Sequence, residues 1–152
     1  MFKIRPANIY EAEILTDIAA RSEAYWGYDS TFIENFKSLY RVTEDWIDNT
    51  LTFVIEEDKD IIGFYSLLLD EKKTSLEYLY IEPKNIGKGY GKLLWEHMVK
   101  SCKEQDIDEI VLVTSPQAKE FYTKMGAIQT GEVESIVIKD RKIPKLIYTI
   151  EK

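Results

Sequence analysis

Residues 81–94 have the sequence IEPKNIGKGYGKLL and join a predicted strand to a predicted helix. Three glycines in five positions, Gly87, Gly89 and Gly91, let the backbone approach a bulky ligand closely. The first turn of the following helix presents free N–H groups and a partial positive charge, which together bind phosphate. Residues 83–95 also contain three lysines and no acidic residue. The stretch therefore predicts an anion-binding loop, and a merely flexible strand-to-helix connection is the alternative.

The spacing of these glycines argues against two common nucleotide-binding motifs. A dinucleotide fingerprint, G-x-G-x-x-G, that begins at Gly87 requires a third glycine where the chain has Lys92. A P-loop, G-x-x-x-x-G-K-[ST], requires Ser or Thr at the position of Leu93, and Ile86 stands where its first glycine belongs. A nucleotide-dependent enzyme is therefore disfavoured.

Hydrophobic periodicity predicts the elements on both sides of the loop. The expected strands are 2–6, 51–57, 61–69, 75–82, 109–113 and two strands within 127–150 that turn near Asp140-Arg141. The expected helices are 8–25, 30–39, a short turn at 44–48, 89–104 and 115–126, and Asn8 with Glu11 has the spacing of a capping box at the start of the first. A meander followed by a strand–helix–strand crossover implies an α/β (α+β) fold. Its mixed, mostly antiparallel central sheet of about seven strands would carry helices on both faces.

Length and composition predict a single domain over residues 1–152, because the chain shows no linker and no repeat. The formal net charge of −7 argues against nucleic acid or an anionic membrane as a partner. One cysteine excludes an intrachain disulfide, and the first residues show no apolar signal segment, so we expect a cytoplasmic location. One histidine and one cysteine support neither a structural zinc site nor a Cys-His pair, so no metal is expected.

Four segments of the chain resemble the GNAT acyltransferase superfamily. They are LYIEP at 79–83, GKGYG at 87–91, AKEFY at 118–122 and GA at 126–127. The order of the predicted elements is similar to that fold along nearly the whole chain. The family signature, [Q/R]-x-x-G-x-[G/A], falls on residues 86–91, where Gly89 and Gly91 match it. Ile86 stands in place of the usual Gln or Arg, a departure that concerns a side-chain contact and not the backbone loop.

The resemblance implies that the donor substrate is acetyl-CoA or a related acyl-CoA. Its pyrophosphate would lie on backbone N–H groups of the glycine loop, and its pantetheine arm would pair with the preceding strand like an added strand. The loop residues so implied are Gly87, Lys88, Gly89, Tyr90, Gly91 and Lys92. The strand residues so implied are Leu79, Tyr80 and Ile81.

Tyr122 belongs to a helical stripe with Ala118, Phe121 and Met125. Periodicity alone favours a core tyrosine whose hydroxyl finds a partner. The resemblance instead aligns Tyr122 with the family tyrosine that protonates the departing CoA thiolate. A thiol with a pKa of ~8.5 leaves best when a proton arrives as the carbon–sulfur bond breaks. Ser115, where family members often have Asn, is expected to cap the helix.

Glu77 is predicted to lie on an otherwise apolar strand face with Leu79 and Ile81. The opposite face would hold Leu76, Tyr78 and Tyr80. Burial would raise the pKa of Glu77 and suit a general base that takes a proton from an ammonium, directly or through water. The alternative is a solvated carboxylate at the open end of the strand.

The connection between the first two predicted helices contains Tyr25, Trp26, Tyr28 and Asp29. In the family, this region helps to form the acceptor pocket, and aromatic faces beside a carboxylate suit an amine cation. Trp26 and Tyr28 are therefore the expected substrate-binding residues. The alternative is that these rings only hold the two helices on the sheet.

The residues and the resemblance together predict an N-acetyltransferase that moves an acetyl group from acetyl-CoA to a primary amine, with a small-molecule amine favoured. Transfer would be direct, in a ternary complex. One alternative is a non-catalytic acyl-CoA-binding or sensing module, which would need neither Tyr122 nor a base. Another is an acetyltransferase that acts on a protein N-terminus or lysine. The acceptor, the acyl length and the oligomeric state, including a homodimer, stay open.

Overall fold

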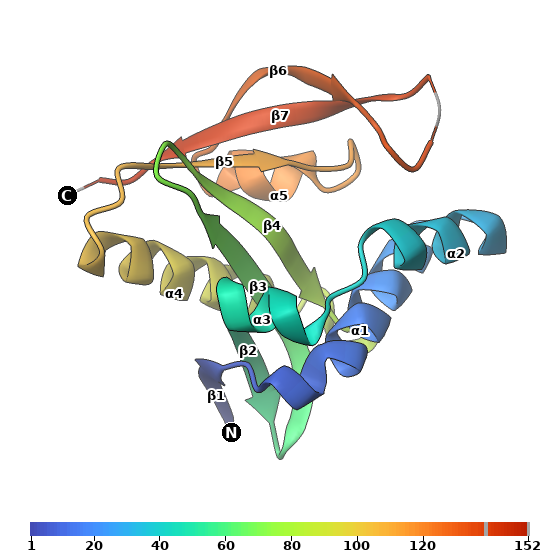
Figure 1. The fold of residues 1–152 in the computed structure, drawn as a ribbon, viewed down its shortest axis with the longest axis horizontal. Helices are drawn as coiled ribbons and strands as arrows, with labels where there is room; N and C mark the ends of the chain where they lie inside the picture. Colours follow the sequence, from blue (N-terminus) through green and yellow to red (C-terminus); the bar gives the residue numbers. More distant parts are fainter. Residues whose placement is uncertain (139, 152) are drawn as a thin grey trace.

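The computed structural model describes residues 1–138 and 140–151, and within them seven strands form one sheet (Figure 1). The strands are β1 (Phe2–Pro6), β2 (Leu51–Glu57), β3 (Asp60–Leu69), β4 (Thr74–Ile81), β5 (Glu109–Val113), β6 (Ile128–Glu134) and β7 (Lys142–Thr149). The helices are α1 (Ala12–Ala24), α2 (Ser30–Leu39), α3 (Glu44–Asn49), α4 (Tyr90–Glu104) and α5 (Lys119–Lys124), with 3₁₀ turns η1 (Ile9–Glu11) and η2 (Pro83–Asn85). No helix in the described ranges is long and apolar enough to cross a membrane.

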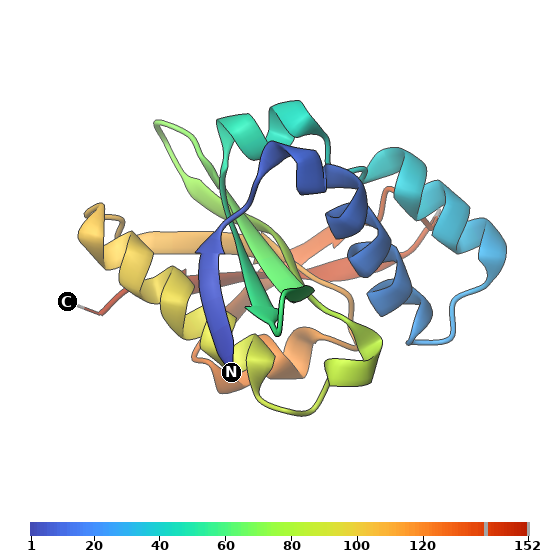
Figure 2. The ribbon, with the colours of Figure 1, turned by 90° about the horizontal axis from the view of Figure 1, so that it is seen from below.

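The strand order is β1-β2-β3-β4-β5-β7-β6, and neighbouring strands are antiparallel except for the parallel pair β4 and β5. Helices α1, α2 and α3 cover one face of the sheet, and α4 and α5 cover the other (Figure 2). This arrangement confirms the expected fold class and the expected order of elements.

Each face of the sheet has its own hydrophobic core. On the α4 side, Leu94, Met98 and Cys102 are fully buried. On the α1 side, the fully buried side chains of Leu15 and Ile18 pack against the inner strands. Each such large aliphatic side chain contributes about 1.5–3 kcal/mol by leaving water, so the two cores clamp the sheet between helices.

Strand β4 contains a β-bulge beside its parallel neighbour. Ser66 of β3 pairs with Tyr78 of β4, whereas the next residue, Leu67, pairs with Leu76. Glu77 is therefore the extra residue of the bulge. A bulge bends its strand and increases the local twist, which redirects everything that follows it.

The bulge also reverses the alternation of side chains along β4. Leu76 packs in the α4-side core, together with Leu79 and Ile81, while Tyr78 and Tyr80 pack in the α1-side core. The prediction that Leu76 shares a face with the two tyrosines is therefore wrong. A period of two describes a regular strand, and one inserted residue moves all preceding side chains to the other face.

Strands β4 and β5 pair over a short distance and then separate. Their ladder in the described residues consists of Ser75 with Val111 and Leu76 with Leu112. Beyond it, β4 continues to Ile81 while β5 stays paired with β7, and Figure 1 shows the two strands diverging. The sheet is thus open at its centre, at the carboxyl ends of its only parallel pair among the described strands.

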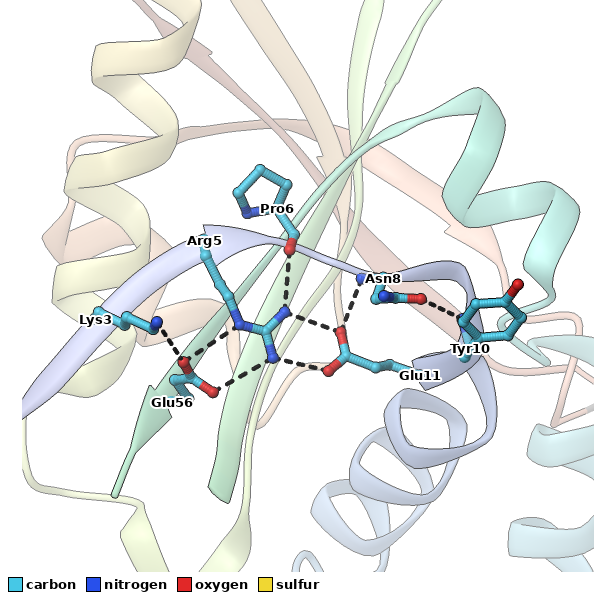
Figure 3. Close-up of polar contacts among 7 residues, drawn as sticks. All are labelled: Lys3, Arg5, Pro6, Asn8, Tyr10, Glu11 and Glu56. Carbon is cyan, nitrogen blue, oxygen red and sulfur yellow. Dashed lines mark hydrogen bonds and ion pairs between the residues drawn. The ribbon is translucent and has the colours of Figure 1, made fainter. Parts of the chain in front are cut away.

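Arg5 joins β1, β2 and the start of α1 (Figure 3). Its guanidinium donates to both carboxylate oxygens of Glu11, at 3.0 and 2.8 Å, and to Glu56 of β2 at 3.3 Å. Glu11 accepts a further bond from the Asn8 N–H at 2.8 Å, and the Asn8 side chain accepts from the Tyr10 N–H at 2.9 Å, which completes the expected capping box. The network fixes the direction in which α1 leaves the sheet.

Helix α5 begins later than predicted, at Lys119 and not at 115–116. The Ser115 hydroxyl accepts from the Ala118 N–H at 3.2 Å, so Ser115 caps a turn that precedes the helix. This turn covers residues 116–118, and the regular helix starts after it.

Candidate active site

A cavity of about 840 Å³ lies where β4 and β5 diverge. Its wall is contributed by β4, the glycine loop, the end of β5, α5, the α1–α2 segment and the β6–β7 connection. The predicted site residues that line it are Trp26, Tyr28, Glu77, Leu79, Tyr80, Ile81, Gly87, Gly89, Tyr90, Gly91, Lys92 and Tyr122. Of the predicted set, Lys88 is exposed and lies outside this lining. The cavity therefore brings together predicted site residues that are nearly 100 positions apart in the sequence.

The open edge of β4 presents backbone groups to this cavity. The Glu82 N–H donates to the Ile62 carbonyl of the β3 side at 2.8 Å, which sets the alternation of the antiparallel ladder. By that alternation the backbone of Tyr80 bonds toward β3, while those of Leu79 and Ile81 are turned toward the gap left by β5. The strand can accept an extended ligand as it would accept another strand. This assigns the backbone role to Leu79 and Ile81, and leaves Tyr80 to act through its side chain.

The glycine loop has the shape of an anion-binding turn. Gly87 and Gly89 have positive φ angles of 86° and 88°, a conformation that favours glycine. A Cβ atom built at either position meets no described atom within 4 Å. Gly89 is also the N-cap of α4 and brings no capping side chain, so the first-turn N–H groups of the helix face this space. The residues present therefore fit a pyrophosphate.

Gly91 lines the cavity and also serves helix packing. A Cβ atom at this position would lie 3.2 Å from Cε1 of Phe121, so the missing side chain lets α5 approach α4 closely. Ile86, at the position where the family usually has Gln or Arg, packs its apolar side chain against the core. The loop thus offers main-chain donors and no charged side chain at the signature position.

Tyr122 is both a core residue and a cavity residue. Its side chain is 7% exposed and its ring lies 5.8 Å from Trp95 and 5.1 Å from Phe121. Burial raises the pKa of the Tyr122 hydroxyl, and the nearby charge of Glu23 raises it further. The hydroxyl therefore holds its proton at neutral pH, as a general acid must before the reaction.

Glu77 is exposed, so of its two interpretations the structure agrees with the solvated carboxylate and not with the buried one. The reason is the bulge, which turns this side chain outward while its neighbours on both sides stay buried. Glu77 still lines the cavity, near the hydroxyls of Tyr40 and Tyr78. Burial, and secondarily the charge of Glu77, raise the pKa of both tyrosines.

Glu23, in the last turn of α1, was not singled out from the sequence. It lines the cavity, is half-buried, and its Oε1 accepts a hydrogen bond from the Tyr80 hydroxyl at 2.8 Å. Burial raises the pKa of this carboxyl, while the Tyr80 bond and the charge of Arg141 oppose that rise. A signal existed: Glu23 continues the i, i+4, i+8 stripe of Leu15 and Ala19, and a carboxylate on a buried stripe needs a reason.

Three segments meet at the side of the cavity that Tyr28 lines. The Tyr28 hydroxyl donates to Oε1 of Gln117 at 3.1 Å, and Nη2 of Arg141 donates to the same oxygen at 3.2 Å. The Arg141 guanidinium also lies 5.4 Å from the centre of the Tyr28 ring, in a cation–π arrangement. This clasp, defined as Tyr28, Gln117 and Arg141, links the α1–α2 connection, the segment before α5 and the β6–β7 connection.

Trp26 lines the cavity but is 43% exposed, with its ring packed edge-on against Tyr25 at 5.2 Å. Within residues 1–138 and 140–151, no group of three or more His, Cys, Asp or Glu side chains could hold a metal ion. The cavity therefore offers hydroxyls, carboxylates, backbone donors and aromatic faces as its chemical groups.

The sequence matches a family model described as "Acetyltransferase (GNAT) domain" over residues 15–136. A curated relative, the "Uncharacterized N-acetyltransferase ycf52" of Gracilaria tenuistipitata var. liui, is 27% identical over 88 residues. That alignment covers 57% of this chain and about half, 48%, of the length of the relative.

Solved structures share the fold over the full length. The PaiA N-acetyltransferase from Thermoplasma acidophilum in complex with coenzyme A has a TM-score of 0.83 at 22% identity, covering 98% of this chain and 99% of that one. The YncA structure from Salmonella typhimurium with its cofactor acetyl-CoA has a TM-score of 0.72 at 15% identity, with 100% and 95% covered. The ribosomal-protein-S18-alanine N-acetyltransferase from Escherichia coli has a TM-score of 0.73 at 15% identity, with 100% and 96% covered. Because the family model spans most of the chain and the fold agrees, this chain belongs to the GNAT acetyltransferase family.

Proposed function

We propose that the protein transfers an acetyl group from acetyl-CoA to a primary amine. The observation that carries the proposal is the position of Tyr122, a buried hydroxyl that keeps its proton, in the same cavity as the open edge of β4 and the glycine loop. A binding module would need the edge and the loop but not a protonated hydroxyl inside the cavity. The complexes of PaiA with coenzyme A and of YncA with acetyl-CoA support this choice of donor.

On the donor side, the chain would act mainly through its backbone. The N–H groups around Gly87 and Gly89 and the start of α4 would hold the pyrophosphate. Leu79 and Ile81 would bond the pantetheine arm along β4, and an N–H of this edge would polarise the thioester carbonyl. Acetyl-CoA supplies an activated acetyl group, so no activating cofactor is needed from the chain.

Tyr122 would donate its proton to the CoA sulfur as the carbon–sulfur bond breaks. Removing the negative charge from the leaving group in this way contributes typically 10²–10⁴-fold to the rate of such a step.

On the acceptor side, Trp26, Tyr28 and the tyrosines of β4 would surround an amine. Aromatic faces attract a cation, and the carboxylates of Glu23 and Glu77 give the cavity two negative groups. The clasp of Tyr28, Gln117 and Arg141 joins three segments at this side, and we take it to suit a small molecule better than a folded protein chain. A small-molecule amine is therefore favoured over a protein lysine or N-terminus.

The test is a panel of primary amines and N-terminal peptides incubated with acetyl-CoA and the purified protein. Release of free CoA thiol that requires both substrates, together with an acetylated product by mass spectrometry, is the expected result. The best turnover should come from a small amine. Tight acetyl-CoA binding without turnover of any acceptor would favour the binding module, and preferential turnover of peptides would shift the acceptor class.

A further inference from the structure

Glu23 is placed to receive a proton inside the proposed acceptor pocket. Its Oε1 accepts from the Tyr80 hydroxyl at 2.8 Å, which fixes one oxygen and leaves the carboxylate in the cavity wall. The other titratable or charged groups in electrostatic contact with it are Tyr40 of α2, Tyr122 of α5 and Arg141 of the β6–β7 connection. Counting Tyr80, Glu23 has four such neighbours, of which three are neutral tyrosine hydroxyls and one is the Arg141 cation. Glu23 is therefore the carboxylate of this group.

We infer that Glu23 accepts a proton from the acceptor ammonium, and that the neutral carboxyl so formed assists Tyr122 in giving up its own proton. This inference rests on the proposed function, because it assigns the base for that reaction. A primary amine is mostly protonated at neutral pH and must lose a proton before its nitrogen can attack. Burial, which raises the pKa of Glu23, improves the match between this carboxylate and that task.

Glu77 is the rival, and its surroundings are less suited. Its side chain is exposed at the bulge of β4, so solvent screens its charge. Glu23 is half-buried, hydrogen-bonded to Tyr80 and in electrostatic contact with Tyr122, the proposed acid. The base and the acid therefore line the same cavity, as a direct transfer between two substrates requires.

The protons balance as follows. The ammonium gives one proton to Glu23, which later releases it to solvent. A bond forms between the amine nitrogen and the acetyl carbon, and the bond between that carbon and sulfur breaks. Tyr122 gives its proton to the sulfur and recovers one from the nitrogen, which becomes the amide N–H. The sum is one acetylated amine, one CoA thiol and one proton released.

The two steps are coupled by charge. An ionised Glu23 opposes formation of a phenolate at Tyr122, which is why its charge raises the pKa of that hydroxyl. Once Glu23 has taken the ammonium proton, this opposition is gone and Tyr122 becomes a stronger acid. The proton transfer that makes the amine reactive thus also makes Tyr122 a stronger acid toward the CoA sulfur. When no amine is bound, Glu23 stays ionised and Tyr122 stays less acidic.

The experiment compares Glu23→Gln with Glu13→Gln, which makes the same change of charge on an exposed position of the same helix. Each variant is assayed with the best small amine of the panel from about pH 6 to about pH 9, and its thermal shift with acetyl-CoA is recorded. Glu23→Gln should lose about 10²-fold in kcat/KM at neutral pH, and the loss should shrink as the amine deprotonates in solution. Glu13→Gln should match the wild type, and all three proteins should respond equally to acetyl-CoA.

A loss that is the same at every pH would mean that Glu23 only supports the fold or the shape of the pocket, and would overturn the inference. Wild-type activity in Glu23→Gln would do the same and leave the proposed function standing. Absence of turnover by the wild type would instead overturn the proposed function and the inference together. If Glu23→Gln does not fold, Glu23→Asp replaces it, and this variant should keep the wild-type shape of the pH profile at a lower rate.

A double variant tests the coupling. If neutralisation of Glu23 assists Tyr122, Glu23→Gln should cost clearly less in a Tyr122→Phe background than in the wild type. Independent, multiplicative losses would contradict the charge coupling while leaving Glu23 as a base.

Discussion

The donor half and the acceptor half of the cavity are built from different parts of the chain. The donor half consists of the open edge of β4 and the glycine loop, two segments that follow each other directly in the sequence. By the proposed function, it would work through backbone groups. The acceptor half combines side chains of α1, the α1–α2 connection, the segment before α5 and the β6–β7 connection. It would work through carboxylates, hydroxyls and rings that only folding brings together.

This difference determines which half of the site can be recognised from the sequence alone. A backbone site needs glycines at fixed spacing, and that pattern is visible at Gly87 and Gly89 without any structure. A side-chain site assembled from distant segments leaves no local pattern, so Gln117 and Arg141 could not be linked to Tyr28. Because the two halves come from different segments, a mutation in one half should leave the other half largely unchanged.

Tyr122→Phe acts where the two halves meet and should have the largest effect. Removal of one oxygen deletes the proposed acid but keeps the ring packed against Trp95 and Phe121. We expect kcat to fall about 10²-fold or more with acetyl-CoA affinity nearly unchanged. Steady-state kinetics with a turned-over amine and a binding titration measure the two quantities.

If the hydroxyl only satisfies a contact in the core, the outcome differs. Stability would then fall by about 0.5–1.5 kcal/mol, and turnover would stay at the wild-type level across the pH range. That result would remove Tyr122 from the reaction and leave the donor half as a binding site alone.

Gly89→Ala should disable the donor half and spare the acceptor half. The added methyl group occupies space next to the first turn of α4, which we assign to the pyrophosphate. We expect the Kd for CoA to rise at least about tenfold, equivalent to about 1.4 kcal/mol. Isothermal titration of the folded variant measures it.

Gly27→Ala is the matched control, because Gly27 has a similar φ of 90° and equally open surroundings but lies in the α1–α2 connection. Both variants carry the strain of a non-glycine residue in this conformation, about 1–2 kcal/mol. Equal CoA affinities in the two variants would place the pyrophosphate elsewhere.

Glu11→Gln should weaken the contacts that hold the start of α1, the helix that carries Glu23. We expect it to have the smallest effect of these variants. Glu11 carries the bidentate bond to Arg5 and the capping box that seat α1 (Figure 3). The Arg5 hydrogen bond chiefly lowers the pKa of Glu11 in the folded state. Its contribution is therefore complete above the unfolded pKa of about 4.3 and is lost as the pH falls through the lower folded value.

At neutral pH we expect a loss of about 1 kcal/mol, a modest figure because solvent partly screens this pair. For a chain of this size that corresponds to a fall in Tm of about 2–4 °C. The difference from the wild type should disappear in acid, as followed by thermal unfolding at several pH values. Glu13→Gln, on the same helix, should stay within about 0.5 kcal/mol of the wild type at every pH. A pH-independent difference for Glu11→Gln would contradict the role of its charge.

Local patterns predicted much of the fold and of the donor half. The order of elements, the capping box at Asn8 and Glu11, and the helix start after Gly89 follow from periodicity and from glycine chemistry. The bulge at Glu77 could not be predicted, because residues 78–81 are apolar on both faces and no break in the hydrophobic pattern marks the extra residue. The bulge exposes Glu77, whereas Glu23 is half-buried and its neighbours come from four other segments of the chain.

The central claim is that acetyl-CoA binds in the opening between β4 and β5. The most direct measurement is the Tm of the wild-type protein with acetyl-CoA, CoA, NADH or ATP. A ligand at ~100 times its Kd adds about 2.7 kcal/mol to the stability of the folded state. At about 2–4 °C for each kcal/mol, acetyl-CoA and CoA should raise Tm by roughly 5–11 °C, with little change from NADH. A rise with NADH and none with either CoA species would contradict the account.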